Sequence, residues 1–172
     1  MTHRPDVADD TDVGSAPIAP DHFRRVLGHF LTGVTVVSAM CREEPVGLAV
    51  GSFFSVSLDP PLVGFCAAKT STSWPGIKEV GHFCVNVLAA DQEAICRQFA
   101  TAKGADKFRG VGWTTTGGGA PRLDRVLAWI DCAIETVHEA GDHEICIGRV
   151  HRLGVDRGRP PLPFFRGQFL IT

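Results

Sequence analysis

The chain has 172 residues, a net charge of −2 with neutral histidines, and 44% hydrophobic residues. These values favour one globular domain with a substantial core. The scattered basic residues argue against a nucleic-acid partner, and no apolar run approaches the roughly 20 residues that cross a membrane. Acidic residues occupy the start of the chain, where a signal peptide needs an apolar core, so a cytoplasmic location is expected.

The first part of the chain divides into a tail and a helix. Residues 1–19 are rich in Asp, Pro, Gly and Ala without apolar periodicity, which predicts a disordered tail before one folded domain, residues 20–172. Apolar residues then recur at helical spacing and predict an amphipathic helix over residues 21–31. Asp21 is the expected N-cap, and Gly33 is expected to end the helix.

The stretch from Val46 to Val63 changes character along its length. It begins as a strand in which apolar and small residues alternate, and it is expected to form a hairpin with the β-branched strand at residues 34–40. It then becomes small and hydroxylated and stops at Asp59-Pro60-Pro61, where neither proline can donate to a sheet. A second strand, residues 62–68, follows. The connection between the two strands suits a planar ligand with polar edges, and an ordinary serine-rich connection is the alternative.

The segment from Lys69 to Ser73 supplies one cation and four hydroxyls before a helix predicted over residues 72–80. A helix N-terminus with extra donors attracts anions, so this segment is a candidate phosphate site. A capping cluster beside a solvated lysine is the alternative. Gly81 ends the helix, and residues 83–88 predict a strand buried on both faces. Its Asn86 must be hydrogen-bonded, either to the backbone or to a ligand.

The last third of the chain predicts a short helix, a flexible segment and a pair of strands. The helix covers residues 91–99. A glycine-punctuated stretch runs from after Phe108 to Gly119, and its Trp113 and Gly117-Gly118-Gly119 predict a flexible surface segment. The three adjacent glycines there lack the spacing of a phosphate-binding fingerprint. Residues 127–137 alternate as a strand, Gly141-Asp142 supplies a tight turn, and His143 begins the next strand.

Metal and disulfide sites are not expected. His138, His143, Cys132 and Cys146 fall on two strands of one predicted hairpin, but they have no recognised ligand spacing. The six cysteines include no CxxC pair and lie mostly in apolar runs. They are therefore expected to be reduced core thiols.

Several segments together resemble the flavin reductase family, the NAD(P)H:flavin oxidoreductases of two-component monooxygenases. The resemblance is carried, in chain order, by Thr32 to Val37, Gly47-Leu48-Ala49, Ser52-Phe53, Ser55 to Val63, Phe83 to Leu88, Gly141-Asp142-His143 and Phe165-Arg166-Gly167 with Phe169. It implies a mainly β fold, a six-stranded antiparallel, Greek-key-like FMN-binding split barrel with flanking helices, and a homodimer. The tight hairpins and the lack of βαβ alternation independently favour an antiparallel barrel.

The resemblance implies hydride transfer from NADH or NADPH to FMN or FAD, with delivery of reduced flavin to a flavin-dependent monooxygenase component. Such chemistry resides in the cofactors, so the absence of an evident nucleophile or carboxylate pair in the sequence is consistent with it. Two alternatives stay open. A split-barrel oxidase would keep its flavin and purify yellow, whereas a non-catalytic flavin-binding module would bind flavin without consuming NADH.

The resemblance also implies the site residues. His143 is expected at the nicotinamide, and a histidine that merely caps its turn is the alternative. The flavin-contacting residues would be Ala49, Val50, Gly51 and Ser52 at the isoalloxazine edge; Ser55, Val56, Ser57, Lys69, Ser71 and Ser73 along the ribityl chain and phosphate; and Asn86, Phe99, Lys107, Phe165 and Arg166 beside the pocket. The chain has no tyrosine, so stacking is the role left for Phe165.

Overall fold

The computed structural model describes residues 17–156 and 158–170. Residues 1–16, most of the predicted disordered tail, lie outside the described residues. Within the two described ranges, none of the helices has the length and apolar character that crossing a membrane requires.

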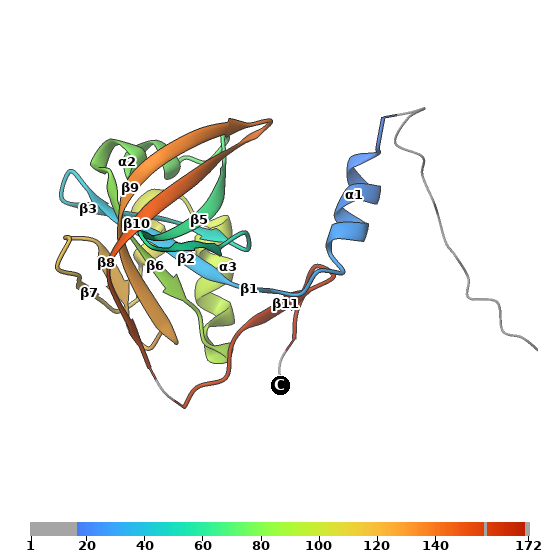
Figure 1. Ribbon diagram of the computed structural model, residues 1–172. Coiled ribbons are helices and arrows are strands. Elements are labelled where there is room, and N and C mark those ends of the chain that lie inside the picture. The colour runs from blue at the N-terminus through green and yellow to red at the C-terminus, as the bar shows by residue number, and fades with distance from the viewer. Residues whose placement is uncertain (1–16, 157, 171–172) are drawn as a thin grey trace, which may run out of the picture.

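One seven-stranded sheet forms the body of the molecule (Figure 1). In spatial order its strands are β3 (Glu44–Val50), β2 (Thr35–Cys41), β6 (His82–Val87), β9 (Ala128–Ala140), β10 (His143–Val155), β5 (Pro61–Ala68) and β4 (Phe54–Leu58). All neighbours pair antiparallel, and sequence-distant strands such as β2 and β6 lie side by side. The predicted mainly β, antiparallel fold is confirmed.

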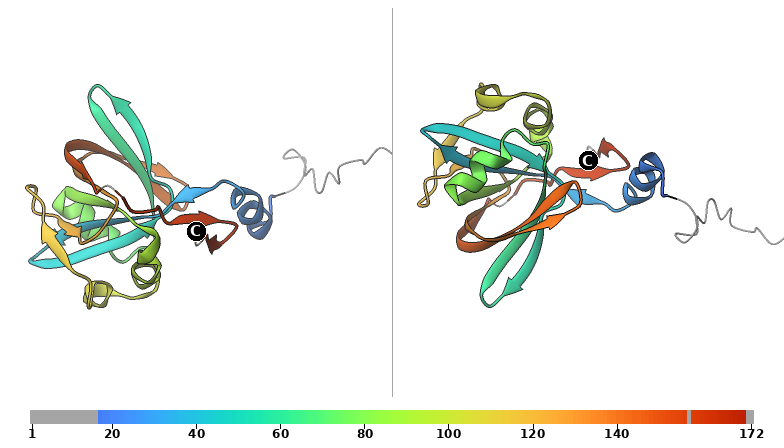
Figure 2. Two further views of the ribbon diagram at one scale, coloured as in Figure 1. Left: turned by 90° about the horizontal axis from the view of Figure 1, so that it is seen from below. Right: turned by 90° about the horizontal axis from the view of Figure 1, so that it is seen from above.

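The sheet has one strand more than the six expected. Residues 54–58, interpreted from the sequence as part of a loop, form β4 and pair with β5. Their alternation of Ser55, Val56 and Ser57 suits an exposed strand. The β4–β5 hairpin extends away from the body, as Figure 2 shows.

The sheet curls without closing. The ends of β3 and β5 approach each other, but in the described part of the chain no ladder joins these two strands. Ser52, just after β3, links them instead: its Oγ accepts the N–H of Cys66 at 2.9 Å and donates to the Cys66 carbonyl at 3.3 Å. The barrel is therefore split between β3 and β5.

Two helices pack on the sheet. α2 (Trp74–Val80) buries Trp74 and Ile77 in the barrel core, where the Phe65 ring lies edge-on to Trp74 at 5.5 Å and to Phe83 at 5.4 Å. α3 (Glu93–Thr101) lies between two short 3₁₀ turns, η1 (Ala90–Gln92) and η2 (Gly104–Phe108). Its Phe99 packs 4.8 Å from Phe108 in a second core on the other side of the sheet.

The first helix is shorter than predicted. α1 runs from Pro20 to Leu27, with Ala19 at its N-cap and Gly28 at its C-cap, so the expected cap at Asp21 was wrong. Asp21 lies in the first turn and pairs with Arg24 at 2.9 Å. α1 stands apart from the sheet body (Figures 1 and 2).

A second small sheet connects α1 to the C-terminal end of the described chain. β1 (Thr32–Gly33) follows α1 and pairs with β11 (Pro163–Phe165), which pairs in turn with β12 (Gln168–Phe169).

The segment predicted to be flexible is instead held in place. After η2, β7 (Trp113–Thr115) and β8 (Pro121–Leu123) form a hairpin. The carboxylate of Asp131, on β9, accepts the Thr116 hydroxyl at 2.7 Å and the Gly118 N–H at 3.1 Å, and it lies 3.2 Å from the His82 ring. Because Asp131 is almost completely buried, it fixes the glycine turn firmly to the sheet.

Candidate functional site

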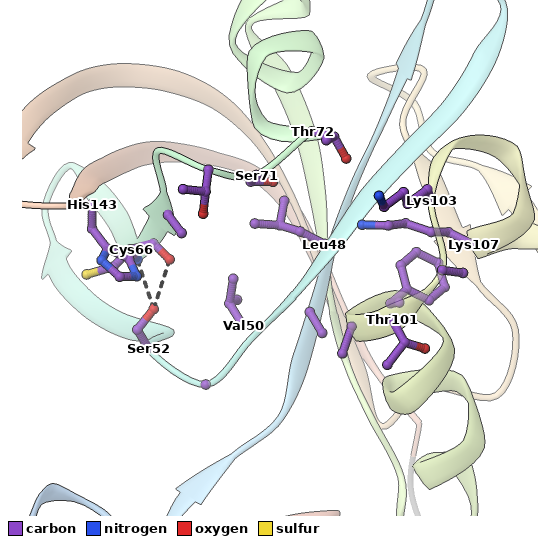
Figure 3. A pocket seen from close by; sticks show the side chains of 17 residues that line it. Leu48, Val50, Ser52, Cys66, Ser71, Thr72, Thr101, Lys103, Lys107 and His143 are labelled. Carbon is purple, nitrogen blue, oxygen red and sulfur yellow. Dashed lines mark hydrogen bonds between the residues drawn. The ribbon is translucent and has the colours of Figure 1, made fainter. Parts of the chain in front are cut away.

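An open cavity of about 580 Å³ occupies the split between β3 and β5 (Figure 3). Its volume is typical of a site for a small organic ligand. The walls come from β3 and the following loop, from β5 and the loop to α2, from α3 and the turn after it, and from the head of β10. The lining residues are Leu48, Ala49, Val50, Gly51, Ser52, Cys66, Ala68, Thr70, Ser71, Thr72, Phe99, Ala100, Thr101, Ala102, Lys103, Lys107 and His143.

The lining has a distinct chemical character. None of its described residues is an aspartate or a glutamate, while two lysines and one histidine contribute. Hydroxyl groups come from the β3–β4 loop, the β5–α2 loop and the end of α3. Such a lining offers hydrogen-bond donors and positive charge, so it suits an anionic ligand with many acceptor atoms.

The β3 wall holds four predicted residues, Ala49, Val50, Gly51 and Ser52, and all of them line the cavity. Gly47, just before them, lets α3 come close, because a Cβ added there would lie 2.7 Å from the Phe99 ring. Phe99 therefore reaches the same cavity from α3.

The β5–α2 loop differs in detail from the predicted phosphate site. Ser71 lines the cavity, and its Oγ accepts the N–H groups of Ser73 and Trp74, both at 3.3 Å. Lys69 does not line it. Its amine pairs with Glu139, which raises the lysine pKa, and its backbone N–H donates to the Asp142 carbonyl at 3.0 Å. The nearby cations that do face the cavity are Lys103 and Lys107.

Lys107 is the buried cation of the site. Its side chain extends from η2, and the residue is only 7% exposed. Nζ donates to the Gly47 carbonyl at 2.9 Å and to the Ser73 hydroxyl at 3.1 Å, so Ser73 lies behind the lining. Burial lowers the pKa of the Lys107 amine.

His143 lies across the cavity from the two lysines, close to Ser52 and Cys66 (Figure 3). Its Nδ1 is 2.8 Å from a carboxylate oxygen of Asp142, and the imidazole lowers the pKa of that carboxyl. The tight turn before His143 is confirmed, with Gly141 at φ +62°.

The next residue, Glu144, anchors the head of β10. It accepts hydrogen bonds from the Trp74 indole and from Lys78, whose Nζ lies 3.0 and 2.8 Å from the two carboxylate oxygens. The Lys78 hydrogen bond, followed by that of Trp74, lowers the pKa of Glu144. This places His143 on a strand end that is tied directly to α2.

Several predicted residues lie outside the cavity lining. Ser55, Val56 and Ser57 belong to β4 in the extended hairpin. Phe165 lies at the end of β11, with its ring 5.9 Å from that of His29, and the Arg166 N–H donates to the Gly28 carbonyl at 2.8 Å. Phe165 and Arg166 thus contact the segment after α1 and do not line the cavity.

Asn86 is fully buried in β6, and its side chain is occupied by the protein. Nδ2 donates to the Val36 carbonyl at 3.1 Å and to the Ser38 hydroxyl at 2.9 Å, while Oδ1 accepts the Leu123 N–H at 2.8 Å. The predicted contact between Asn86 and a ligand is therefore corrected. The structure has the alternative, hydrogen bonds from the Asn86 side chain to the backbone, because β8 covers this side of the strand.

Sequence reasoning missed part of the lining. Cys66 was expected to be a core thiol but is half-buried and lines the cavity, and Lys103 had no signal beyond its charge. All six cysteines are free thiols, and Cys84, Cys96, Cys132 and Cys146 are buried. In the described ranges no three His, Cys, Asp or Glu side chains are grouped so as to hold a metal ion.

Comparison with known proteins gives a consistent result. The family model described as "Flavin reductase like domain" matches residues 27–171. The chain is 47% identical over 164 residues to the flavin-dependent monooxygenase reductase subunit HsaB of Rhodococcus jostii, covering 95% of this chain and 84% of that protein. It is 46% identical over 159 residues to a flavin reductase of Pseudomonas putida, covering 92% and 93%.

Solved structures show the same similarity. The NADH:FAD oxidoreductase SgcE6 of Streptomyces globisporus superposes with a TM-score of 0.86 at 36% identity, covering 96% of this chain and 98% of that one.

Proposed function

The chain belongs to the flavin reductase family, and we propose that it reduces free FMN or FAD with NADH or NADPH and supplies the reduced flavin to a flavin-dependent monooxygenase component. The observation that carries the proposal is the cavity in the split of the barrel, which has hydroxyl and cationic groups and no carboxylate among its described lining residues. Relatives named as flavin reductases and as a monooxygenase reductase subunit support it.

When bound, the nicotinamide and the flavin supply the hydride donor and acceptor, and the protein has to hold both rings at reacting distance. Ala49 to Ser52 offer small side chains and backbone groups to a planar ring. Ser71 and the neighbouring threonines offer hydroxyls to a polyol chain. Because the cavity is open, a flavin could enter and leave as a substrate.

His143 is the proposed nicotinamide-contacting residue. It begins β10, which is tied to α2 through Glu144, and its Nδ1 lies against Asp142. The other ring nitrogen is then available to a ligand in the cavity. We propose that His143 orients the carboxamide of the nicotinamide and balances its change of charge as hydride leaves.

We also propose a homodimer. α1 leaves Phe23, Val26 and Leu27 about half exposed, and Phe30 after it is 75% exposed. An apolar groove of about 470 Å³ formed by Phe30, Leu31, Phe53 and others shares Gly51 and Ser52 with the flavin cavity. A second copy that covers this apolar surface would also close one side of the cavity. A cytoplasmic location stays a prediction of the sequence.

NADH oxidation, followed by absorbance with and without added FMN, FAD or riboflavin, tests the proposal. We expect oxidation that depends on free flavin and saturates with it. If the protein binds flavin but oxidises neither NADH nor NADPH, the reductase proposal fails and a flavin-binding module remains. A yellow protein that turns over without added flavin would instead indicate a reductase or oxidase with a resident cofactor.

A further inference from the structure

The lysines of this chain differ in how their charges are balanced. Lys69 and Lys78 each form an ion pair with a glutamate, Glu139 and Glu144 respectively. Within the described residues, Lys103 and Lys107 have no such partner, and both line the cavity. The unbalanced lysines are thus gathered where a ligand binds.

Lys107 is the more unusual of the two, because it is buried. Its two hydrogen-bond acceptors, the Gly47 carbonyl and the Ser73 hydroxyl, are neutral. A buried ammonium without a counter-charge is unfavourable, since it loses hydration and gains only dipolar contacts. The lowered pKa of its amine reflects the same imbalance.

The geometry leaves one donor for a ligand. An ammonium has three N–H bonds, and the protein engages two of them. In Figure 3 the nitrogen ends of Lys107 and Lys103 point in the same direction, towards Leu48 and the side of the cavity where Thr72 lies. Thr72 and Ser71 there add hydroxyl donors, so several donors meet close to one positive charge.

We propose that Lys107 supplies the counter-charge for the phosphate of the flavin, so that the site selects phosphorylated flavins, FMN and FAD, over riboflavin. The inference rests on the proposed function for the flavin itself but does not depend on turnover. A phosphate brings both the negative charge that the buried lysine lacks and multiple acceptors for the neighbouring hydroxyls. Riboflavin offers the same ring and polyol without that charge.

Equilibrium binding of FMN and of riboflavin, measured by quenching of flavin fluorescence at neutral pH, tests the proposal. The wild-type protein is expected to bind FMN more tightly than riboflavin. In Lys107→Met the FMN dissociation constant should rise on the order of 10- to 100-fold, the usual range for one charge-assisted hydrogen bond. The riboflavin constant should change by about twofold or less, because riboflavin reports whether the pocket remains intact.

Three further variants locate the charge. Lys107→Arg keeps the cation and should retain most of the FMN preference. Lys103→Met removes the other unpaired lysine of the lining, and Lys69→Met removes the lysine that the sequence favoured. A loss of FMN preference confined to either of these two variants would overturn the assignment to Lys107.

Other outcomes are equally decisive. Equal affinity of the wild-type protein for FMN and riboflavin overturns the proposal even if Lys107→Met does not fold. Parallel losses for both flavins in Lys107→Met overturn it too, because they indicate a bracing role between Gly47 and Ser73. If no flavin supports NADH oxidation but the FMN preference depends on Lys107, the proposed function fails while the phosphate assignment stands.

Discussion

Two side chains on opposite walls of one cavity have different physical settings. Lys107 is buried and held by two neutral acceptors, whereas His143 lies at a strand end beside the exposed carboxylate of Asp142. The first setting favours recognition of a fixed negative charge. The second leaves an imidazole free to adjust to a bound ring. Binding and orientation are therefore separable functions that single substitutions can address.

Substitution of His143 tests the orienting role. In His143→Ala we expect kcat/KM for NADH to fall about 10- to 100-fold, because the nicotinamide loses a positioning contact. The flavin dissociation constant should stay within about twofold of wild type. Steady-state kinetics and fluorescence titration provide the two values. Asp142→Asn, which keeps the imidazole but removes the neighbouring charge, should give a smaller loss, and unchanged NADH kinetics in His143→Ala would reject the role.

The buried thiols predict how stability depends on pH. Burial raises the pKa of Cys84 and of Cys146 to about 12, from an ordinary value of 9.0. The folded protein thus keeps thiol protons that the unfolded chain releases. Their stabilising contribution is complete below about pH 9 and is lost as pH rises towards 12, at about 1.4 kcal/mol per pH unit for each thiol.

Urea unfolding of the reduced protein from about pH 8 to about pH 11 measures this effect. As pH rises, the free energy of unfolding of Cys146→Ala should fall less steeply than that of wild type, by about 1.4 kcal/mol per pH unit for the one thiol removed. For Cys84→Ala/Cys146→Ala the difference in slope should be about twice as large. Other groups that titrate in this range are common to all three proteins, and Cys132, whose pKa is raised mainly by burial, keeps its main cause in each of them. The differences between slopes therefore report chiefly the thiols that are removed. Parallel profiles would contradict the prediction.

At the scale of elements, local sequence patterns predicted most strands but missed the side-chain contacts between residues that are far apart in the sequence. β-Branched and apolar residues identified the strand around residues 34–40, and alternation identified those around residues 83–88 and 127–137, since each has a strong local signal. The phosphate-site prediction chose Lys69 because it adjoins four hydroxyls in sequence. The fold pairs Lys69 with Glu139 and brings Lys107, from an element far along the chain, to Ser73, one of the same four hydroxyls. Sequence proximity cannot reveal which lysine receives a glutamate partner.

The β7–β8 hairpin illustrates the same limit. Three consecutive glycines predict mobility, but Asp131 on β9 accepts hydrogen bonds from Thr116 and Gly118 and lies beside His82. A single buried carboxylate thereby joins three segments. It had no distinguishing mark in a strand where charged and apolar residues alternate.

Removing that carboxylate should loosen the hairpin without affecting the cavity. We expect Asp131→Ala to lower the free energy of unfolding by about 3 kcal/mol, because several partly buried donors lose their acceptor. Thermal and urea unfolding provide the measurement. Asp156→Ala, an exposed aspartate, is the matched control and should change stability by about 0.5 kcal/mol or less. A loss of similar size in the control would contradict the special role of Asp131.

At the scale of the whole molecule, two parts extend from the body and expose apolar side chains. α1 leaves Leu27 about half exposed, and Leu58 at the tip of the β4–β5 hairpin is 95% exposed. Within the described residues both side chains stay largely exposed, and the groove that adjoins the cavity is lined by residues close to each of these parts, Phe30 and Leu31 after α1 and Phe54 at the start of β4. Exposed apolar surface of this extent is typical of an interface, which is why the homodimer and the flavin site should be linked.

Leu27→Glu tests that linkage. A glutamate in an apolar interface would be buried without a partner, so we expect a wild-type dimer in sedimentation velocity and a monomer, or a much weaker dimer, for the variant. Flavin affinity should fall when the dimer is lost, because Gly51 and Ser52 belong to both the groove and the cavity. Leu153→Glu makes the same change at a 68% exposed leucine that belongs to β10 and not to the apolar face of α1, and this variant should remain dimeric with wild-type flavin affinity. A monomeric wild-type protein would reject the proposed homodimer. If Leu27→Glu is monomeric but binds flavin as tightly as wild type, the homodimer proposal stands, and one chain completes the flavin site alone.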